Sequence, residues 1–309
     1  MMVKPSIQRY KIKILLQKES YFLAVVGAVL LWSISFVATK IAFKAFPPLT
    51  LGALRFILAA WLLAILLWMQ RGFIRPTRND LGSLLMSGIL GITMYFSMEN
   101  YGVKLATAAD ASLIVAAYPA ITMVLEMVFY RVSISRVRFL GVGLAMFGLY
   151  LIIRESTNIG GPYRLLGDVI LAATGIVWSF YNFITRKIAN KYPTILITFY
   201  QTLAGAVAFI PLALAERKQW RMPGPDSLFA LLYLGLFCSV AAFLLYAYGL
   251  RKMASSSAVT LMNLVPVFGV CFSVLLLHES ISIVQVLGGL IVIAGIILGI
   301  RQIKQDNED

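Results

Sequence analysis

The chain has few of the side chains on which most enzymes and metal sites depend. Its 309 residues contain one histidine and two cysteines, and Cys238 and Cys271 both lie in apolar segments. No histidine or cysteine cluster has the spacing of a zinc site, and no serine sits in a nucleophile motif. No glycine-rich phosphate loop is present either, which excludes ATP-driven pumping within this chain. We therefore expect neither a metal nor a cofactor, and we do not expect an enzyme.

Charged residues are also scarce, at 13% of the sequence, whereas hydrophobic residues make up 60% and the mean hydropathy is +0.87. A soluble domain needs far more charge to cover its surface. A helix that crosses the hydrocarbon core of a membrane needs about 20 apolar residues. The sequence predicts an all-α membrane protein with ten transmembrane helices. They cover residues 21–42, 49–69, 81–103, 107–129, 136–153, 166–188, 194–214, 227–250, 256–277 and 281–300.

The second half of the sequence repeats the first at a shift of 147 residues. In this alignment Tyr118-Pro119 matches Val265-Pro266. Each unit holds five expected helices, and because five is odd, the units form two inverted-topology repeats, as in many transporters. The expected division is a basic cytoplasmic N-terminal segment (1–19), a first repeat (20–155), a second repeat (156–301) and a cytoplasmic acidic tail (302–309).

Basic residues outnumber acidic ones by 27 to 13, which gives a net charge of +14. In a membrane protein this excess belongs to the loops, so we expect no nucleic-acid partner. With the N-terminus inside, 18 basic residues fall in inner loops and tails and 8 on the outer side, while Arg55 lies within a helix. The positive-inside rule then places both termini in the cytoplasm, in a multi-pass protein of the cytoplasmic (inner) membrane. The expected partners are the lipid bilayer and a small-molecule substrate, for a monomer or a homodimer.

Matching polar stripes run along the first and sixth expected helices. The side chains recur at i, i+3 and i+4, so each set shares one helix face. We predict that these side chains bind substrate, although serine also forms hydrogen bonds between membrane helices. Tryptophan well inside a span, away from the interfaces where it usually collects, favours the binding interpretation. The six residues are Trp32, Ser35, Phe36, Trp178, Tyr181 and Asn182.

Acidic side chains are rare within the spans, and each needs a partner or a cavity there. Glu99, near the end of the third helix, is the main candidate for proton coupling or for binding a substrate amine, with Arg55 as its candidate counter-ion. The second repeat has Tyr246 in its place, so the two halves differ. Asp110 begins the fourth helix, where it either complements the helix N-terminus or has a functional role. The candidate binding set is completed by Tyr101, Tyr246 and Asn263.

One helix in each repeat contains a proline, Pro119 in the first and Pro266 in the second. Proline removes a backbone hydrogen bond and frees a carbonyl. Paired helix breaks of this kind point to a transporter's binding site, whereas a static kink would have no direct role. Glycines of the fifth and tenth helices are expected to form close packing faces. They are Gly141, Gly143, Gly148, Gly288, Gly289, Gly295 and Gly299.

These segments resemble the drug/metabolite transporter superfamily, specifically its ten-helix EamA type. The most specific stretch, 278–291 followed by Gly295, looks like the family's closing-helix signature. The first repeat departs from it, because Val132 stands where the second has Glu279, so we expect Glu279 to cap a loop. The resemblance implies two five-helix bundles around a central cavity, with helices 5 and 10 outermost. The resemblance is also carried by Trp32-Ser33, Arg55-Phe56 and 105–113.

Together, the sequence and the resemblance predict a secondary transporter that exports small organic metabolites by alternating access. Amino acids and related amphipathic solutes are the expected substrates, with drugs as further candidates and a proton as the candidate coupling ion. Aromatic walls with few charges suit such zwitterionic or weakly cationic solutes. An uncoupled facilitator or lipid-like flippase would use the same cavity without responding to a proton gradient. A membrane receptor or enzyme is a more remote alternative.

Overall fold

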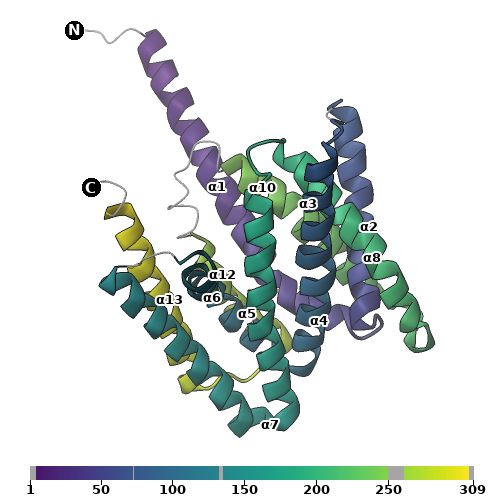
Figure 1. The fold of residues 1–309 in the computed structure, drawn as a ribbon, viewed down its shortest axis with the longest axis vertical. Helices are drawn as coiled ribbons and strands as arrows, with labels where there is room; N and C mark the ends of the chain where they lie inside the picture. The colour runs from purple at the N-terminus through teal and green to yellow at the C-terminus, as the bar shows by residue number, and fades with distance from the viewer. Residues whose placement is uncertain (1–4, 72, 132–134, 250–260, 306–309) are drawn as a thin grey trace.

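A computed structural model describes residues 5–71, 73–131, 135–249 and 261–305, and every regular element within these ranges is helical (Figure 1). The beginning of α1 and the end of α13 both lie toward the upper end of the view in Figure 1. The elements are α1 (Pro5–Ala42), α2 (Pro48–Met69), α3 (Arg78–Gly88), η1 (Ile89–Met94), α4 (Tyr95–Leu105), α5 (Ala108–Val115), α6 (Tyr118–Tyr130), α7 (Arg136–Arg186), α8 (Thr194–Ala215), η2 (Arg217–Gln219), α9 (Pro225–Leu232), η3 (Tyr233–Ala241), α10 (Ala242–Gly249), α12 (Leu264–Leu277) and α13 (Ile283–Gln305).

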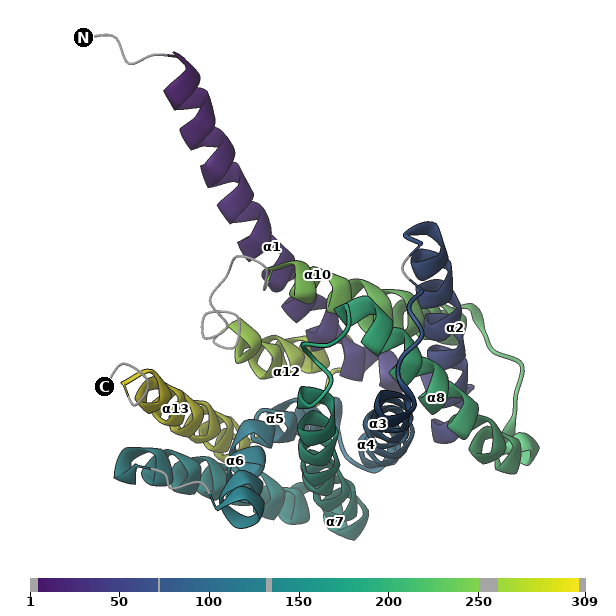
Figure 2. The same cartoon turned by 45° about the horizontal axis from the view of Figure 1, so that its top comes forward.

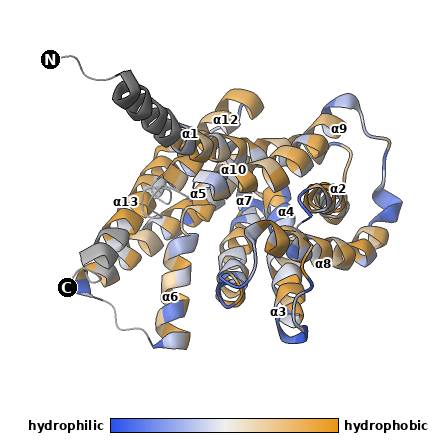
Figure 3. Cartoon of the chain, turned by 90° about the horizontal axis from the view of Figure 1, so that it is seen from above, coloured by the Kyte–Doolittle hydropathy of each residue, from blue (hydrophilic) through white to orange (hydrophobic). Residues whose placement is uncertain are grey.

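Several helical stretches are long and apolar enough to cross a membrane. Within the described residues there are six such stretches, and a seventh if α5 and α6 count as one span bent by 41°. Two shorter apolar helices follow near the C-terminus. Helices suit this environment because they satisfy their own backbone hydrogen bonds in lipid. Figure 3 shows hydrophobic colour along the helices and hydrophilic colour at many connections. These features confirm the predicted all-α membrane fold. The six stretches are Ser20–Ala42, Pro48–Met69, Arg78–Leu105, Pro162–Arg186, Thr194–Ala215 and Pro225–Gly249.

Helix α7 differs from the expectation of two separate helices at 136–153 and 166–188. Helical hydrogen bonding continues from Arg136 to Arg186, and the helix contains Pro162. Figure 1 shows α7 as two arms that meet in a bend at the lower end. A proline inside a helix removes one backbone bond and favours such a kink. The connection is therefore a bent helical segment, where the sequence led us to expect a loop.

The two repeats share unusual backbone features at matching positions. Helix α6 ends at Arg131 and α12 at His278, each in the left-handed conformation, with φ of 50° and 54°. These residues are 147 positions apart, the shift found in the sequence. The π-helix η1 likewise falls, after the same shift, on residues 236–241 of the π-helix η3. Two sequences with different side chains thus adopt the same local deviations from a regular α-helix.

The first arm of α7 packs along α13 through glycines, as the spacing predicted (Figure 2). A Cβ atom on Gly141 would lie 2.6 Å from the carbonyl oxygen of Gly295, and one on Gly148 would lie 2.5 Å from that of Gly288. Both distances are too short for a non-bonded carbon–oxygen contact, so only glycine permits this approach. At Gly143, by contrast, a Cβ atom would have no heavy atom within 4 Å, so this glycine does not take part in the close contact.

Candidate functional site

A buried acid on α4 lies among aromatic rings. Glu99, on α4, is 7% exposed and accepts a hydrogen bond of 2.8 Å from the Tyr95 hydroxyl one helical turn earlier. The Tyr95 ring lies 5.2 Å from that of Trp178 and 6.3 Å from that of Tyr118, measured between centroids. α4 and α6 belong to the first repeat, whereas Trp178 lies on the second arm of α7. The Glu99 group, defined as these four residues, therefore lies between the two repeats.

Arg55, on α2, is equally buried, at 6% exposure. Its Nε donates a hydrogen bond of 2.7 Å to the Ser239 hydroxyl, and its guanidinium carbon lies 4.6 Å from the centroid of the Phe96 ring. A cation over an aromatic face is stabilised by the ring quadrupole. Within the described residues Arg55 and Glu99 form no ion pair, and each makes its hydrogen bond to an uncharged side chain. The role of Arg55 as counter-ion to Glu99 stays a prediction.

A second aromatic group surrounds Trp32 on α1. The Trp32 indole donates a hydrogen bond of 3.1 Å to the carbonyl oxygen of Cys238, and its ring lies 5.2 Å from Phe243 and 5.6 Å from Tyr246. Cys238 precedes Ser239, the partner of Arg55, in the π-helix η3. This π-helix thus connects the Trp32 surroundings to Arg55, and π-helical turns are frequent at functional sites.

The polar stripe of the sixth expected helix is held by local hydrogen bonds. The rings of Trp178 and Tyr181 lie 5.0 Å apart, and the Asn182 amide donates to the Trp178 carbonyl at 2.9 Å. The Tyr181 hydroxyl donates to the Gln201 side chain at 3.3 Å. Gln201, on α8, also donates to Ser87 and Thr185. All three stripe residues are half-buried, so part of each side chain stays accessible in the middle of a span.

Four other predicted site residues have different surroundings. Ser35 donates to the carbonyl of Trp32 in its own helix, and Phe36 is buried in the core cluster that contains Tyr95 and Tyr118. Tyr101 donates a hydrogen bond of 3.1 Å to Glu216, the residue that follows α8. The Asn263 side-chain nitrogen is buried at the start of α12 and has no hydrogen-bond partner among the residues that the structure describes.

Both candidate helix-breaking prolines lie near the beginning of a helix. Pro119 is the second residue of α6, which is bent by 41° from α5, and this break matches the expectation. Pro266 is the third residue of α12, which a turn at Asn263 precedes. Residues 250–260, before that turn, lie outside the described part of the chain. Whether either break contributes to substrate binding stays a prediction.

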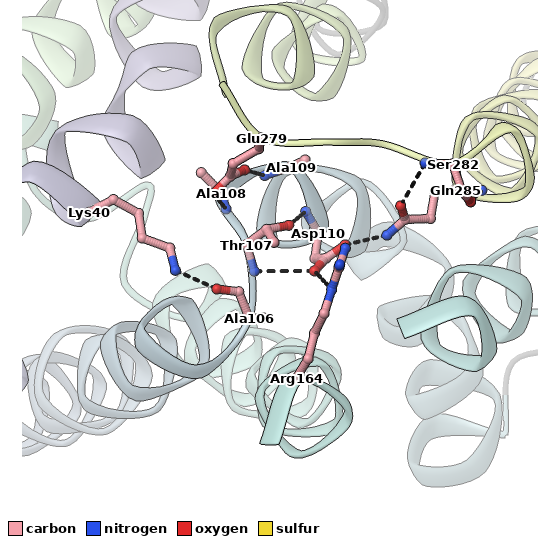
Figure 4. Close-up of polar contacts among 10 residues, drawn as sticks. All are labelled: Lys40, Ala106, Thr107, Ala108, Ala109, Asp110, Arg164, Glu279, Ser282 and Gln285. Atoms are coloured by element: carbon pink, nitrogen blue, oxygen red, sulfur yellow. Dashed lines mark hydrogen bonds and ion pairs between the residues drawn. The ribbon is translucent and has the colours of Figure 1, made fainter. Parts of the chain in front are cut away.

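A polar network connects five segments close to Pro162, the proline inside α7 (Figure 4). Asp110 is completely buried, and its carboxylate accepts hydrogen bonds of 2.8 and 2.9 Å from Arg164 on α7. It also accepts one from Gln285 on α13, and it forms a capping box with Thr107 at the start of α5. The sequence interpretation as a helix cap was therefore correct, but Asp110 also joins two other helices.

Glu279 completes this Asp110 network from the segment between α12 and α13. Its two carboxylate oxygens accept hydrogen bonds of 3.0 Å from the backbone N–H groups of Ala108 and Ala109. It thus caps the beginning of helix α5 in the other repeat, where we expected it to cap a loop. Lys40 on α1 donates to the carbonyl of Ala106 alongside. The Asp110 network is defined here as Lys40, Thr107, Asp110, Arg164, Glu279 and Gln285.

Sequence reasoning missed the roles of Arg164 and Gln285. Arg164 was counted only among the basic residues of the outer loops, and Gln285 only as part of a motif. One signal was available: a buried carboxylate at the start of an apolar helix requires a cation, and Arg164 lies close to the beginning of the sixth expected span.

The ion pairs at the upper end are more exposed than the Asp110–Arg164 pair. Lys191, in the connection between α7 and α8, donates to Asp80 at 2.7 Å, and Asp80 also accepts from Tyr192 at 3.0 Å. The hydrogen bond from Lys191 to the Asp80 carboxylate raises the pKa of Lys191. Glu126 pairs with Arg186 at 3.2 Å.

Comparison with known proteins agrees with this architecture. The model of the EamA-like transporter family matches residues 19–154 and again residues 165–301. An uncharacterized transporter of Archaeoglobus fulgidus is 29% identical over 271 residues, covering 87% of this chain and 93% of that protein. A probable terminal-alkyne amino-acid exporter of Streptantibioticus cattleyicolor is 26% identical, and the match covers 89% of this chain and 91% of that protein.

Solved structures show the same fold. One of them superposes with a TM-score of 0.63 at 21% sequence identity, and the superposition covers 91% of this chain and 97% of the solved chain. The family match extends over both halves of the chain, and these halves contain the Glu99 group and the Asp110 network. The chain is a membrane-embedded transporter that belongs to the EamA-like transporter family.

Proposed function

We propose that this transporter exports small organic metabolites, amino acids or related amphipathic solutes, across the cytoplasmic membrane. The observation that carries the proposal is the Glu99 group, a buried acid among aromatic rings at the junction of the two repeats. A carboxylate binds an amine, and aromatic faces bind both cations and apolar side chains. The name of the Streptantibioticus relative, an amino-acid exporter, supports the same class of substrate.

The half-buried residues beside Glu99 support a substrate path at this place. Trp178 lies against Tyr95, the partner of Glu99, and Trp32 donates to Cys238, which precedes the Ser239 partner of Arg55. In this proposal the rings bind the apolar part of the solute. Arg55 would bind a substrate carboxylate, because among the described residues its guanidinium forms no ion pair and contacts the Ser239 hydroxyl and two aromatic faces.

Alternating access requires one end of the path to be closed while the other is open. The Asp110 network supplies such a closure at the lower end, since it joins α1, α5, α7 and α13 through buried charged hydrogen bonds. Such bonds are stronger than neutral ones and define one arrangement of the helices. The positive-inside rule places this end outside the cell. The proposal therefore assigns the present arrangement to a state closed on the outside, which loads substrate from the cytoplasm.

Export is tested by mass spectrometry of the medium from bacterial cells that overproduce the chain. Cells with the Trp178→Ala variant at equal abundance provide the comparison, and Trp61→Ala provides a matched control because Trp61 is 62% exposed on α2. Accumulation of one metabolite class that Trp178→Ala loses and Trp61→Ala keeps is the expected result. Identical profiles in all three strains would contradict export of a cellular metabolite.

Coupling to protons is tested separately, with purified protein in vesicles loaded with the identified solute. We propose that Glu99 binds either the proton or the substrate amine, which requires transport to respond to a pH gradient. Equal rates with and without the gradient would indicate an uncoupled facilitator. Transport of labelled lipid in place of the solute would indicate a flippase.

A further inference from the structure

A cavity of about 420 Å³ opens among the segment after α1, the end of α4 and the segment after α8. Residues 43–47, which follow α1, form one wall, Lys104 on α4 contributes to another, and residues 218–221 complete it. Four of the lining side chains are cationic, and none is acidic. These four residues, here called the basic cavity, are Lys44, Lys104, Lys218 and Arg221.

The four cations are available for a ligand. Each is exposed, and the ion pairs of the described residues involve other side chains. Glu216 is the acid next to this segment, but it is 4% exposed and does not line the cavity. Its oxygens accept hydrogen bonds from Thr50 and Tyr101. The cavity therefore carries four positive charges that no lining residue neutralises.

The placement of these charges runs against the general pattern of the chain. Only 8 basic residues fall on the side predicted to be outside, against 18 inside. Half of those 8 line this single cavity. Lysine and arginine are depleted in outer loops because they oppose the preferred orientation of insertion. Clustering of like charges also costs free energy through repulsion. An anion bound among them would offset this cost.

The walls of the basic cavity are also preorganised. Trp220 donates a hydrogen bond of 2.9 Å from its indole to Thr50, and Thr50 in turn is held by two hydrogen bonds to Glu216. These contacts fix the 217–221 segment against the beginning of α2. Phe43, Phe46 and Trp220 add aromatic surface among the cations. The colours in Figure 3 show hydrophilic residues in the connection from α8 to α9 beside the apolar helices.

We propose that the basic cavity binds a phosphate-bearing anion. Several cations around an open pocket match the charge and the multiple acceptor oxygens of a phosphate group. The aromatic walls suit a phosphate that is attached to an apolar body, and basic pockets between membrane helices bind anionic lipid headgroups. The phosphate belongs either to the headgroup of an anionic lipid or to a soluble compound. This binding does not depend on what the central site transports.

The test is isothermal titration calorimetry of the full chain in a neutral detergent. The probes are dihexanoyl phosphatidylglycerol, its zwitterionic phosphatidylcholine counterpart and inorganic phosphate. We expect saturable binding of phosphatidylglycerol that weakens as salt is added, because exposed charges are screened. The triple variant Lys104→Gln, Lys218→Gln, Arg221→Gln should lose affinity by about tenfold or more, since each cation near an anionic headgroup contributes about fivefold.

Arg217→Gln is the matched control, because Arg217 is exposed in the same segment but does not line the cavity. Its affinity should stay within about twofold of the unmodified chain. An unchanged thermal midpoint verifies that both variants are folded. If inorganic phosphate displaces the lipid, the ligand of the cavity is a soluble phosphate. If it does not, the ligand is the headgroup of an anionic lipid. Equal binding of both lipids, or equal loss in the triple variant and Arg217→Gln, would overturn the proposal.

Discussion

The two repeats have closely matching backbones but different polar side chains. Arg131 and His278 end corresponding helices in the same left-handed conformation, and both repeats contain a π-helix at corresponding positions. Yet Glu99 of the first repeat corresponds to Tyr246 of the second. The shared backbone supports the inverted two-repeat fold. The unmatched charges point to the positions where the protein needs one specific group, because a fold built from repeats does not itself require asymmetry.

The two ends of the molecule also differ in how deeply their ion pairs are buried. At the lower end the Asp110 network is buried and connects both repeats, whereas in the Asp80–Lys191 pair at the upper end the lysine is exposed. A buried ion pair strongly disfavours the loss of one partner, whereas an exposed pair contributes little. The lower end is therefore expected to open only when several hydrogen bonds break together.

The sharpest test of the asymmetry between repeats compares Glu99→Gln with Tyr246→Phe. Glu99→Gln should reduce transport by at least about tenfold, because a hydrogen bond to a charged group contributes roughly 1.5–3 kcal/mol. Tyr246→Phe keeps the aromatic ring beside Trp32, which is the part proposed to bind substrate, and removes only the hydroxyl, so transport should stay within about twofold. Initial rates in vesicles at several pH values measure both. Full transport with unchanged pH dependence in Glu99→Gln would remove Glu99 from the proposed mechanism.

Arg164→Met is predicted to have the largest effect on stability. It leaves the Asp110 carboxylate buried without its cation, at a cost of roughly 3–5 kcal/mol. Unfolding in mixed micelles measures the change. The double variant with Asp110→Asn should recover part of the loss, because the unpaired charge is then removed. If the single variant were as stable as the unmodified chain, the Asp110 network would not hold the lower end closed.

The glycine contact between the repeats gives the next largest effect. Gly141→Ala places a methyl group against the Gly295 carbonyl, and the required separation of α7 and α13 should cost about 1–3 kcal/mol. Gly143→Ala adds a methyl group on the same helix where nothing is within 4 Å. This control should be neutral or slightly stabilising, by about 0.4–1 kcal/mol. Similar thermal midpoints for the two variants would contradict the close packing.

The exposed pair at the upper end should have the smallest effect. Because the pKa of Lys191 is raised by Asp80, its contribution to stability is present below the pKa of an unpaired lysine. It disappears as the pH rises through the raised value. The difference in thermal midpoint between Lys191→Met and the unmodified chain should thus be small at neutral pH and vanish in strong alkali. Lys187→Met, an exposed neighbour, is the control.

Several local features could be predicted because they depend on residues close in sequence. The length of the apolar stretches predicts the helical spans. The missing N–H of Pro119 predicts the break before it, and the spacing of the glycines predicts the close approach of α7 and α13. The stripe of Trp178, Tyr181 and Asn182 shares a face because of helical periodicity alone. The bend within α7 was missed, because 154–165 carries the polar residues typical of a loop and hydropathy does not report backbone hydrogen bonding.

The sequence by itself determined the membrane-spanning class, the repeat and its inversion, because hydrophobic length and an odd number of spans leave no other arrangement of the chain in a bilayer. Only the tertiary structure decided which polar groups meet. Asp110, Arg164, Gln285 and Glu279 come from four separate segments, and the basic cavity unites residues from three. Such contacts depend on the directions of packed helices, which no local pattern in the sequence encodes.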